Sequence, residues 1–218
     1  MRDVRPLTVV LAPAVFVLTM SLGHAAVPQQ AGDRMTFFVT SAGRGFGADL
    51  GGLTGADAIC QRLAASVGAG SHLWRAYLSA PAADGRPAVN ARDRIGRGPW
   101  RNVHGVEIAS SVEQLHGDDN ALDRDTVLTE RGTAIAPGRH DIMTGSNPDG
   151  TLSMEAPDTT CHAWTSHNAG AAMLGHSNRY GGGSRPKSWN SAHLSRGCSQ
   201  DALRASLGDA LFYCFAAD

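Results

Sequence analysis

The four cysteines are the feature that most constrains how this 218-residue chain can fold. Cys60, Cys161, Cys198 and Cys214 lie apart from one another, and no Cys-x-x-Cys pair occurs. The lack of such a pair argues against a zinc ribbon or a dithiol redox motif. An even number of cysteines in an exported chain predicts two disulfides, which four cysteines can form in three pairings. The cysteine positions alone do not choose among these pairings.

The N-terminus has the layout of a secretory signal. Arg2 and Arg5 precede a mainly apolar stretch over residues 7–22, and small residues end it at Ala25 and Ala26. This order is typical of a signal peptide. The apolar stretch is shorter than the about 20 residues that a membrane-spanning helix needs. We therefore expect residues 1–26 to be a signal peptide, with an uncleaved membrane anchor as the alternative, and the mature protein to lie in the periplasm or outside the cell.

The rest of the chain has the composition of one globular domain. Hydrophobic residues make up 42% of the sequence and charged residues 18%, so we expect a packed core and not a disordered chain. The formal net charge is -1, so the sequence does not show the excess of basic residues that is typical of nucleic-acid-binding proteins. No second long apolar segment follows the signal, so we expect no membrane span after its removal. We expect a mobile leader over residues 27–34 and one domain over residues 35–218.

Hydrophobic patterning predicts an α+β fold with one main helix. Thr54 is expected to cap this helix, with Asp57 three residues later, and glycines at positions 68 and 70 end it. Apolar residues at positions 58, 59, 63 and 67 recur at helical spacing. Strands are expected within residues 35–40, 73–78, 106–109 and 210–216. Residues 110–160 and 166–188 should form long loops, which are usually functional in a compact domain.

Four parts of the chain follow one another in a recognisable order. They are residues 51–60, residues 74–79, residues 145–150 with 160–164, and residues 188–191 with Cys198 and residues 211–215. In this order they resemble the C-type lectin-like fold, and within it endostatin and its bacterial relatives. The resemblance implies antiparallel strands, long loops and nested disulfides, with Cys60 bonded to Cys214 and Cys161 bonded to Cys198. It also implies a non-catalytic binding module for a glycan or an extracellular protein.

The resemblance implies a place for calcium as well. Sugar-binding C-type lectins hold calcium with acidic or amide residues on both sides of a proline, a carboxylate before the next cysteine, and a Trp-Asn-Asp triplet. The matching residues here are Asn147, Asp149, Glu155 (or Asp158) and Asn190, but Ser191 replaces the last carboxylate. Because calcium prefers several charged oxygen ligands, we expect no cofactor and favour a tight turn at residues 147–150, with a calcium site as the alternative.

Carbohydrate binding without a metal is a further expectation. Sugars stack on aromatic faces and exchange hydrogen bonds with amides, and such groups lie in or beside the loops. The ligand candidates are Asn147, Asp149, Trp164, Asn178, Trp189 and Asn190, with Tyr180 beside them. The alternative for each tryptophan is a place in the core.

Histidines are frequent in the later loops, where His162, His167, His176 and His193 occur. Histidine is a common metal ligand, but no His-Glu-x-x-His motif is present. The endostatin zinc site uses N-terminal histidines, which the expected mature N-terminus lacks. We therefore expect no metal site and no catalytic residues. The alternatives are a secreted hydrolase whose histidines and carboxylates converge in one loop pocket, and a structural or adhesion protein with an exposed apolar patch.

Overall fold

The computed structural model describes residue 1 and residues 34–83, 85–180 and 187–218. The expected signal peptide and nearly all of the expected leader fall outside these residues, so both remain predictions. In the described part of the chain, no helix is both long enough and apolar enough to cross a membrane. The architecture is α+β, as predicted, with one main helix and a mostly antiparallel sheet.

A six-stranded sheet forms the centre of the molecule. Its strands are β1 (Phe37–Val39), β2 (Trp74–Ala76), β5 (Asp141–Met143), β6 (Met173–His176), β7 (His193–Leu194) and β8 (Gly208–Ala216). They follow the order β1-β8-β5-β6-β7, and β2 also pairs with β8. The β5–β8 pair is parallel and the other pairs are antiparallel. A separate hairpin joins β3 (Trp100–Arg101) to β4 (Glu107–Ala109).

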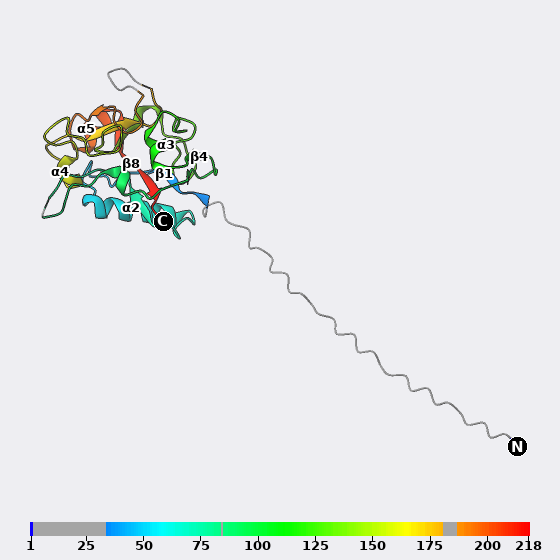
Figure 1. Cartoon of the computed structure of the whole chain (residues 1–218). Coiled ribbons are helices and arrows are strands. Elements are labelled where there is room, and N and C mark those ends of the chain that lie inside the picture. The colour runs from blue at the N-terminus through cyan, green and yellow to red at the C-terminus, as the bar shows by residue number, and fades with distance from the viewer. Residues whose placement is uncertain (2–33, 84, 181–186) are drawn as a thin grey trace.

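The strand β8 separates two hydrophobic clusters because its side chains alternate between the faces of the sheet. Phe212 and Cys214 enter the cluster that contains the helix α2 (Gly52–Ser66). Tyr213 and Phe215 enter the opposite cluster, which includes residues of the β3–β4 hairpin and of α3 (Val112–His116). Figure 1 shows α2 along one side of β8 and α3 with β4 on the other. The long apolar terminal strand therefore organises both halves of the core.

The main helix begins earlier than the sequence pattern suggested. Gly51 precedes it with a φ of 78°, and Thr54 lies within the first turn, so the expected Thr54 cap is wrong. Asp57 binds outside the helix: its carboxylate accepts hydrogen bonds from Arg94 and from the backbone N–H of Ala76. This half-buried acceptor fastens the helix to β2 through its hydrogen bonds with these donors.

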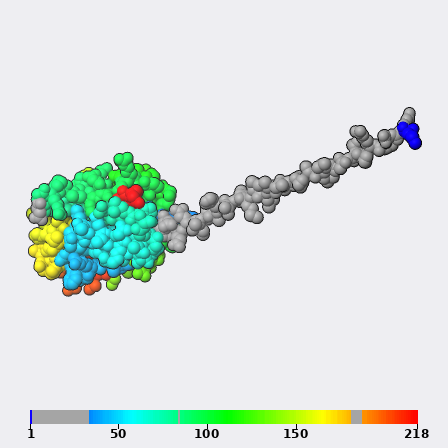
Figure 2. All heavy atoms as spheres, turned by 90° about the horizontal axis from the view of Figure 1, so that it is seen from below, coloured from blue at the N-terminus to red at the C-terminus, as the bar shows by residue number. Residues whose placement is uncertain are grey.

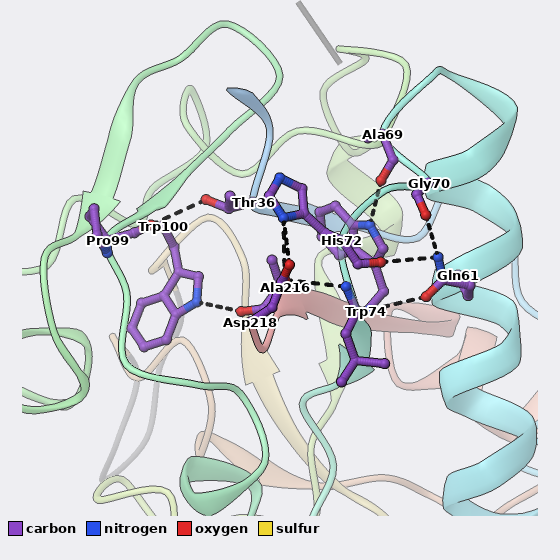
Figure 3. A network of polar contacts seen from close by, with 11 residues as sticks. Thr36, Gln61, Ala69, Gly70, His72, Trp74, Pro99, Trp100, Ala216 and Asp218 are labelled. Carbon is purple, nitrogen blue, oxygen red and sulfur yellow. Dashed lines mark hydrogen bonds and ion pairs between the residues drawn. The ribbon is translucent and has the colours of Figure 1, made fainter. Parts of the chain in front are cut away.

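The far end of the helix is fastened to the C-terminus by polar contacts (Figure 3). Gln61 donates to the carbonyls of Gly70 and His72 and accepts from the backbone N–H of Trp74. The imidazole of His72 lies 3.2 Å from the carboxylate of Asp218. Figure 2 shows the molecule from below the view of Figure 1. On this face the surface is formed largely by residues of α2 and its neighbours, with the C-terminal end among them.

Both disulfides have the nested pairing that the resemblance implied. Cys60 on α2 is bonded to Cys214 on β8, and Cys161 is bonded to Cys198. The first bond joins the main helix to the central strand. The second joins two loop segments, one of which leads into the short helix α5 (Gln200–Ala205), capped by Ser199. Both links lie in the hydrophobic cluster that contains α2, so they hold the core together and also restrain the loops that enter it.

Candidate functional site

The segment that resembles a calcium loop forms a tight turn. The backbone N–H of Gly150 donates to the carbonyl of Asn147 at 2.9 Å. The side-chain amide of Asn147 donates to Thr151 Oγ1 and to the carbonyl of Leu152. The exposed Asp149 accepts from both the N–H and the hydroxyl of Thr151, and these hydrogen bonds lower the pKa of Asp149. The turn that we favoured from the sequence is therefore present.

Asn190 lies beneath this turn and is 1% exposed. Its amide nitrogen donates to the carbonyls of Asn147 and Pro148, each at 3.1 Å, and to the hydroxyl of Tyr77 at 2.9 Å. Its amide oxygen accepts from Ser188 Oγ. These contacts use the groups that a calcium ion or a sugar would need, so the prediction of Asn190 as an accessible ligand residue is wrong.

Tyr77 continues the same network into the core. His116 Nδ1 lies 2.7 Å from the carbonyl of Val112 and therefore carries a proton, which leaves Nε2 to accept from the hydroxyl of Tyr77 at 2.8 Å. Burial raises the pKa of Tyr77 and lowers that of His116. The neutral forms that this network needs are thus the ones that burial favours.

The two candidate tryptophans are core residues. Trp164 is fully buried and donates from Nε1 to the carbonyl of Ser79 at 2.8 Å. Trp189 is 3% exposed and donates from Nε1 to the carbonyl of Leu115. Because neither ring has an open face, the prediction that they stack on a sugar is wrong.

Trp164 reaches the core from an unusual turn. Residues Cys161–Trp164, labelled α4 in Figure 1, all have positive φ, between 48° and 66°. Four consecutive left-handed residues other than glycine are rare, because each costs roughly 1–2 kcal/mol. The Cys161–Cys198 bond and the hydrogen bond from the N–H of Ala163 to Thr160 Oγ1 hold this turn.

Two of the residues considered for sugar binding, Asn178 and Tyr180, share a cavity of about 380 Å³. Its apolar lining includes Val127 and Ile135, and Arg124 and Asp125 lie at it as well. Tyr180 is 65% exposed, and its backbone N–H donates to Asn178 Oδ1. We call this feature the Tyr180 cavity. It combines an exposed aromatic ring, an amide, a carboxylate and a guanidinium over an apolar floor.

His140 also lines the Tyr180 cavity, and on its other side it belongs to a histidine–aspartate cluster. We use this name for His140, Asp141, His176 and His193. Asp141 Oδ1 lies 3.3 Å from His140 Nε2 and 3.4 Å from His176 Nε2, and Asp141 Oδ2 lies 3.1 Å from His193 Nε2. Asp141 and His176 are buried, whereas the side chain of His193 is 42% exposed. The carboxylate raises the pKa of His193.

The sequence did not predict this cluster, because histidines that are close along the chain are not the ones that meet in the folded structure. His162 and His167 were grouped with His176 and His193, but their side chains are 63% and 52% exposed and contact Asp158 and Asp49. Within the described residues, one group of three His, Cys, Asp or Glu side chains lies close enough together to hold a metal ion, and it consists of His140, Asp141 and His176. Asp149 and Glu155, the carboxylates considered for calcium, are not among them.

Comparison with known proteins does not identify a family or a function for this chain. No protein-family model matches the chain, and no curated protein sequence is significantly similar to it.

Proposed function

We propose that this chain is an exported, non-catalytic binding module of the C-type lectin-like, endostatin-like class, and that it binds a carbohydrate in the Tyr180 cavity. The observation that carries the proposal is the lining of that cavity, which includes the exposed Tyr180 together with Asn178 and Asp125. Sugar rings present apolar C–H faces and polar hydroxyls, so they need both an aromatic surface and hydrogen-bonding groups.

Two further features support this proposal. The two disulfides suit an oxidising compartment outside the cytoplasm. The cavity lies among the loops that follow β4, whereas the tight turn at residues 147–150 is fastened from below by Asn190. The proposed binding mode is therefore independent of calcium.

A glycan array tests the proposal when it is run with calcium and with a calcium-selective chelator. We expect selective binding that is the same in both buffers. Replacing Tyr180 with alanine should weaken it about tenfold, equal to about 1.4 kcal/mol. Phe46→Ala is the matched control, because Phe46 is another exposed aromatic residue, at 61% exposure, and does not line the cavity. Equal binding by the wild type and Tyr180→Ala would contradict the proposed site, and binding of no glycan would favour a protein ligand.

One observation favours the alternative of a secreted hydrolase. That alternative required histidines and a carboxylate in one pocket, and His140, Asp141, His176 and His193 line a cavity of about 370 Å³. The alternative predicts turnover of chromogenic esters, phosphates or glycosides that is lost in Asp141→Asn. No turnover in any class, with or without added zinc, would reject it.

A further inference from the structure

Strand pairing brings the members of the histidine–aspartate cluster to one place. Asp141, the first residue of β5, is paired with His176, the last residue of β6, so both side chains leave the same face of the sheet. On its other side Asp141 is paired with Gly208 of β8. A Cβ atom at Gly208 would lie 2.8 Å from the carbonyl oxygen of Asp141, so glycine permits this close approach.

The hydrogen bonds at Nδ1 determine what two of the histidines present to the carboxylate. His140 Nδ1 lies 2.6 Å from the carbonyl of Pro137, and His193 Nδ1 lies 3.0 Å from the carbonyl of Leu194. A carbonyl only accepts, so each Nδ1 carries the proton. In the neutral ring Nε2 then has a lone pair, and in both residues Nε2 faces Asp141.

The carboxylate of Asp141 is faced by the Nε2 atoms of three histidines at 3.1–3.4 Å. Both oxygens of Asp141 are buried, and within the described residues neither receives a hydrogen bond of good geometry. A buried anion is costly unless it is paired with a positive charge or coordinates a metal. When His140 and His193 are neutral, their Nε2 lone pairs increase this cost, whereas a cation between the nitrogens and the carboxylate would remove it.

Two of the three distances between the donor atoms match a tetrahedral metal site, and all three donor atoms lie within 4.8 Å of one another. Zinc binds imidazole nitrogen and carboxylate oxygen at about 2.0–2.2 Å, which places neighbouring ligand atoms about 3.3–3.5 Å apart. Asp141 Oδ1 lies 3.3 Å from His140 Nε2 and 3.4 Å from His176 Nε2. We propose that His140, Asp141 and His176 bind a divalent transition-metal ion, zinc by preference. The site adjoins the proposed carbohydrate site, because His140 also lines the Tyr180 cavity, but metal binding does not depend on that proposed function.

The ligand set determines which cations suit the site. Imidazole nitrogens with one carboxylate suit zinc and its neighbours in the transition series, whereas calcium and magnesium require oxygen ligands. The contact of His140 with Pro137 is the kind of outer contact that orients a metal-bound histidine. His193, on the other carboxylate oxygen, is a positioning residue. The adjoining cavity of about 370 Å³ provides room for a fourth ligand.

Metal titration of the full chain tests the proposal. The protein is treated with a chelator, dialysed and titrated with zinc in competition with a chromophoric chelator. We expect one zinc ion per chain, no competition from calcium, and at least tenfold weaker binding in His140→Ala and in His176→Ala. His162→Ala is the matched control, because His162 is exposed and lies outside the cluster; its affinity should equal that of the wild type.

Cobalt provides a readout that does not depend on the variants folding. Cobalt-loaded wild-type protein should show the intense visible absorption of a tetrahedral site, and zinc should displace it in equal amount. His193→Gln should retain stoichiometric binding at reduced affinity, because it changes a positioning residue and no ligand. The proposal is overturned if the wild type binds no zinc, if folded His140→Ala binds as tightly as the wild type, or if only His162→Ala loses binding.

Discussion

Replacing Asp141 with asparagine should change stability in opposite directions with and without zinc. In the metal-free protein the carboxylate of Asp141 is buried, and within the described residues neither of its oxygens accepts a hydrogen bond of good geometry. Asparagine has nearly the same shape, no charge, and an N–H that can donate to the Nε2 lone pair of His140 or His193, 3.1–3.3 Å from the present carboxylate oxygens. Removing an unsatisfied buried group is worth about 1–3 kcal/mol. The metal-free variant should therefore be more stable than the wild type by that amount.

Zinc should invert this order. At a free zinc concentration about 1,000 times the dissociation constant, binding raises the free energy of unfolding of the wild type by about 4.1 kcal/mol, more than the variant gains without metal. The variant lacks a ligand and should gain little. Urea unfolding followed by tryptophan fluorescence, in chelator and in zinc, measures both effects, because Trp74, Trp100, Trp164 and Trp189 are all buried.

A second buried carboxylate provides the control. The Glu130 side chain is 0% exposed, but it accepts from the N–H and the hydroxyl of Ser41. Glu130→Gln should therefore reduce stability equally in both buffers. If Asp141→Asn also reduces the stability of the metal-free protein and zinc changes nothing, the argument for a cation at Asp141 is refuted.

Three further predictions concern the framework around the sites. Replacing both cysteines of a disulfide with serine should lower the free energy of unfolding by about 5 kcal/mol for Cys60–Cys214 and by about 4 kcal/mol for Cys161–Cys198, because the first bond closes the longer loop. Urea unfolding that shows the greater loss of stability for the Cys161–Cys198 variant would contradict this. Gly175→Ala should cost about 1–3 kcal/mol, because the new Cβ would lie 1.9 Å from the carbonyl oxygen of Trp189, whereas Gly138→Ala, with nothing within 4 Å, should be neutral; equal unfolding midpoints would refute it. Burial lowers the pKa of His116, so below about pH 6.5 the unfolded chain binds a proton that the folded state excludes, and the free energy of unfolding decreases as the pH decreases. His116→Gln should flatten this pH dependence in urea unfolding between about pH 5 and 7. An unchanged slope would contradict the assignment.

Long elements were predictable from the sequence because their patterns repeat. The helix α2 and the strand β8 are each long enough for apolar spacing to be visible, and both occur where expected. The capping residue was wrong because Asp57 binds Arg94 and Ala76, and neither contact is visible in local sequence. The disulfide pairing came from the resemblance and is confirmed.

Short elements and the site were not predictable in the same way. The strands β5, β6 and β7 contain two to four residues, too few to show an alternation. The histidine–aspartate cluster arises from the pairing of β5 with β6 and of β6 with β7, so its members are neighbours only in the folded chain. Trp164 was expected near a ligand, but a left-handed turn directs it into the core. Asn178, by contrast, does line a cavity.

The most direct test of the carbohydrate proposal locates the bound sugar. Isotope-labelled protein is titrated with the strongest glycan from the array while backbone amide chemical shifts are recorded. The proposed site predicts shifts concentrated at residues 124–127, 134–137 and 177–180, which contribute the lining of the Tyr180 cavity. Shifts confined to residues 147–152 and 188–190 would place the sugar at the tight turn instead and contradict the proposed site.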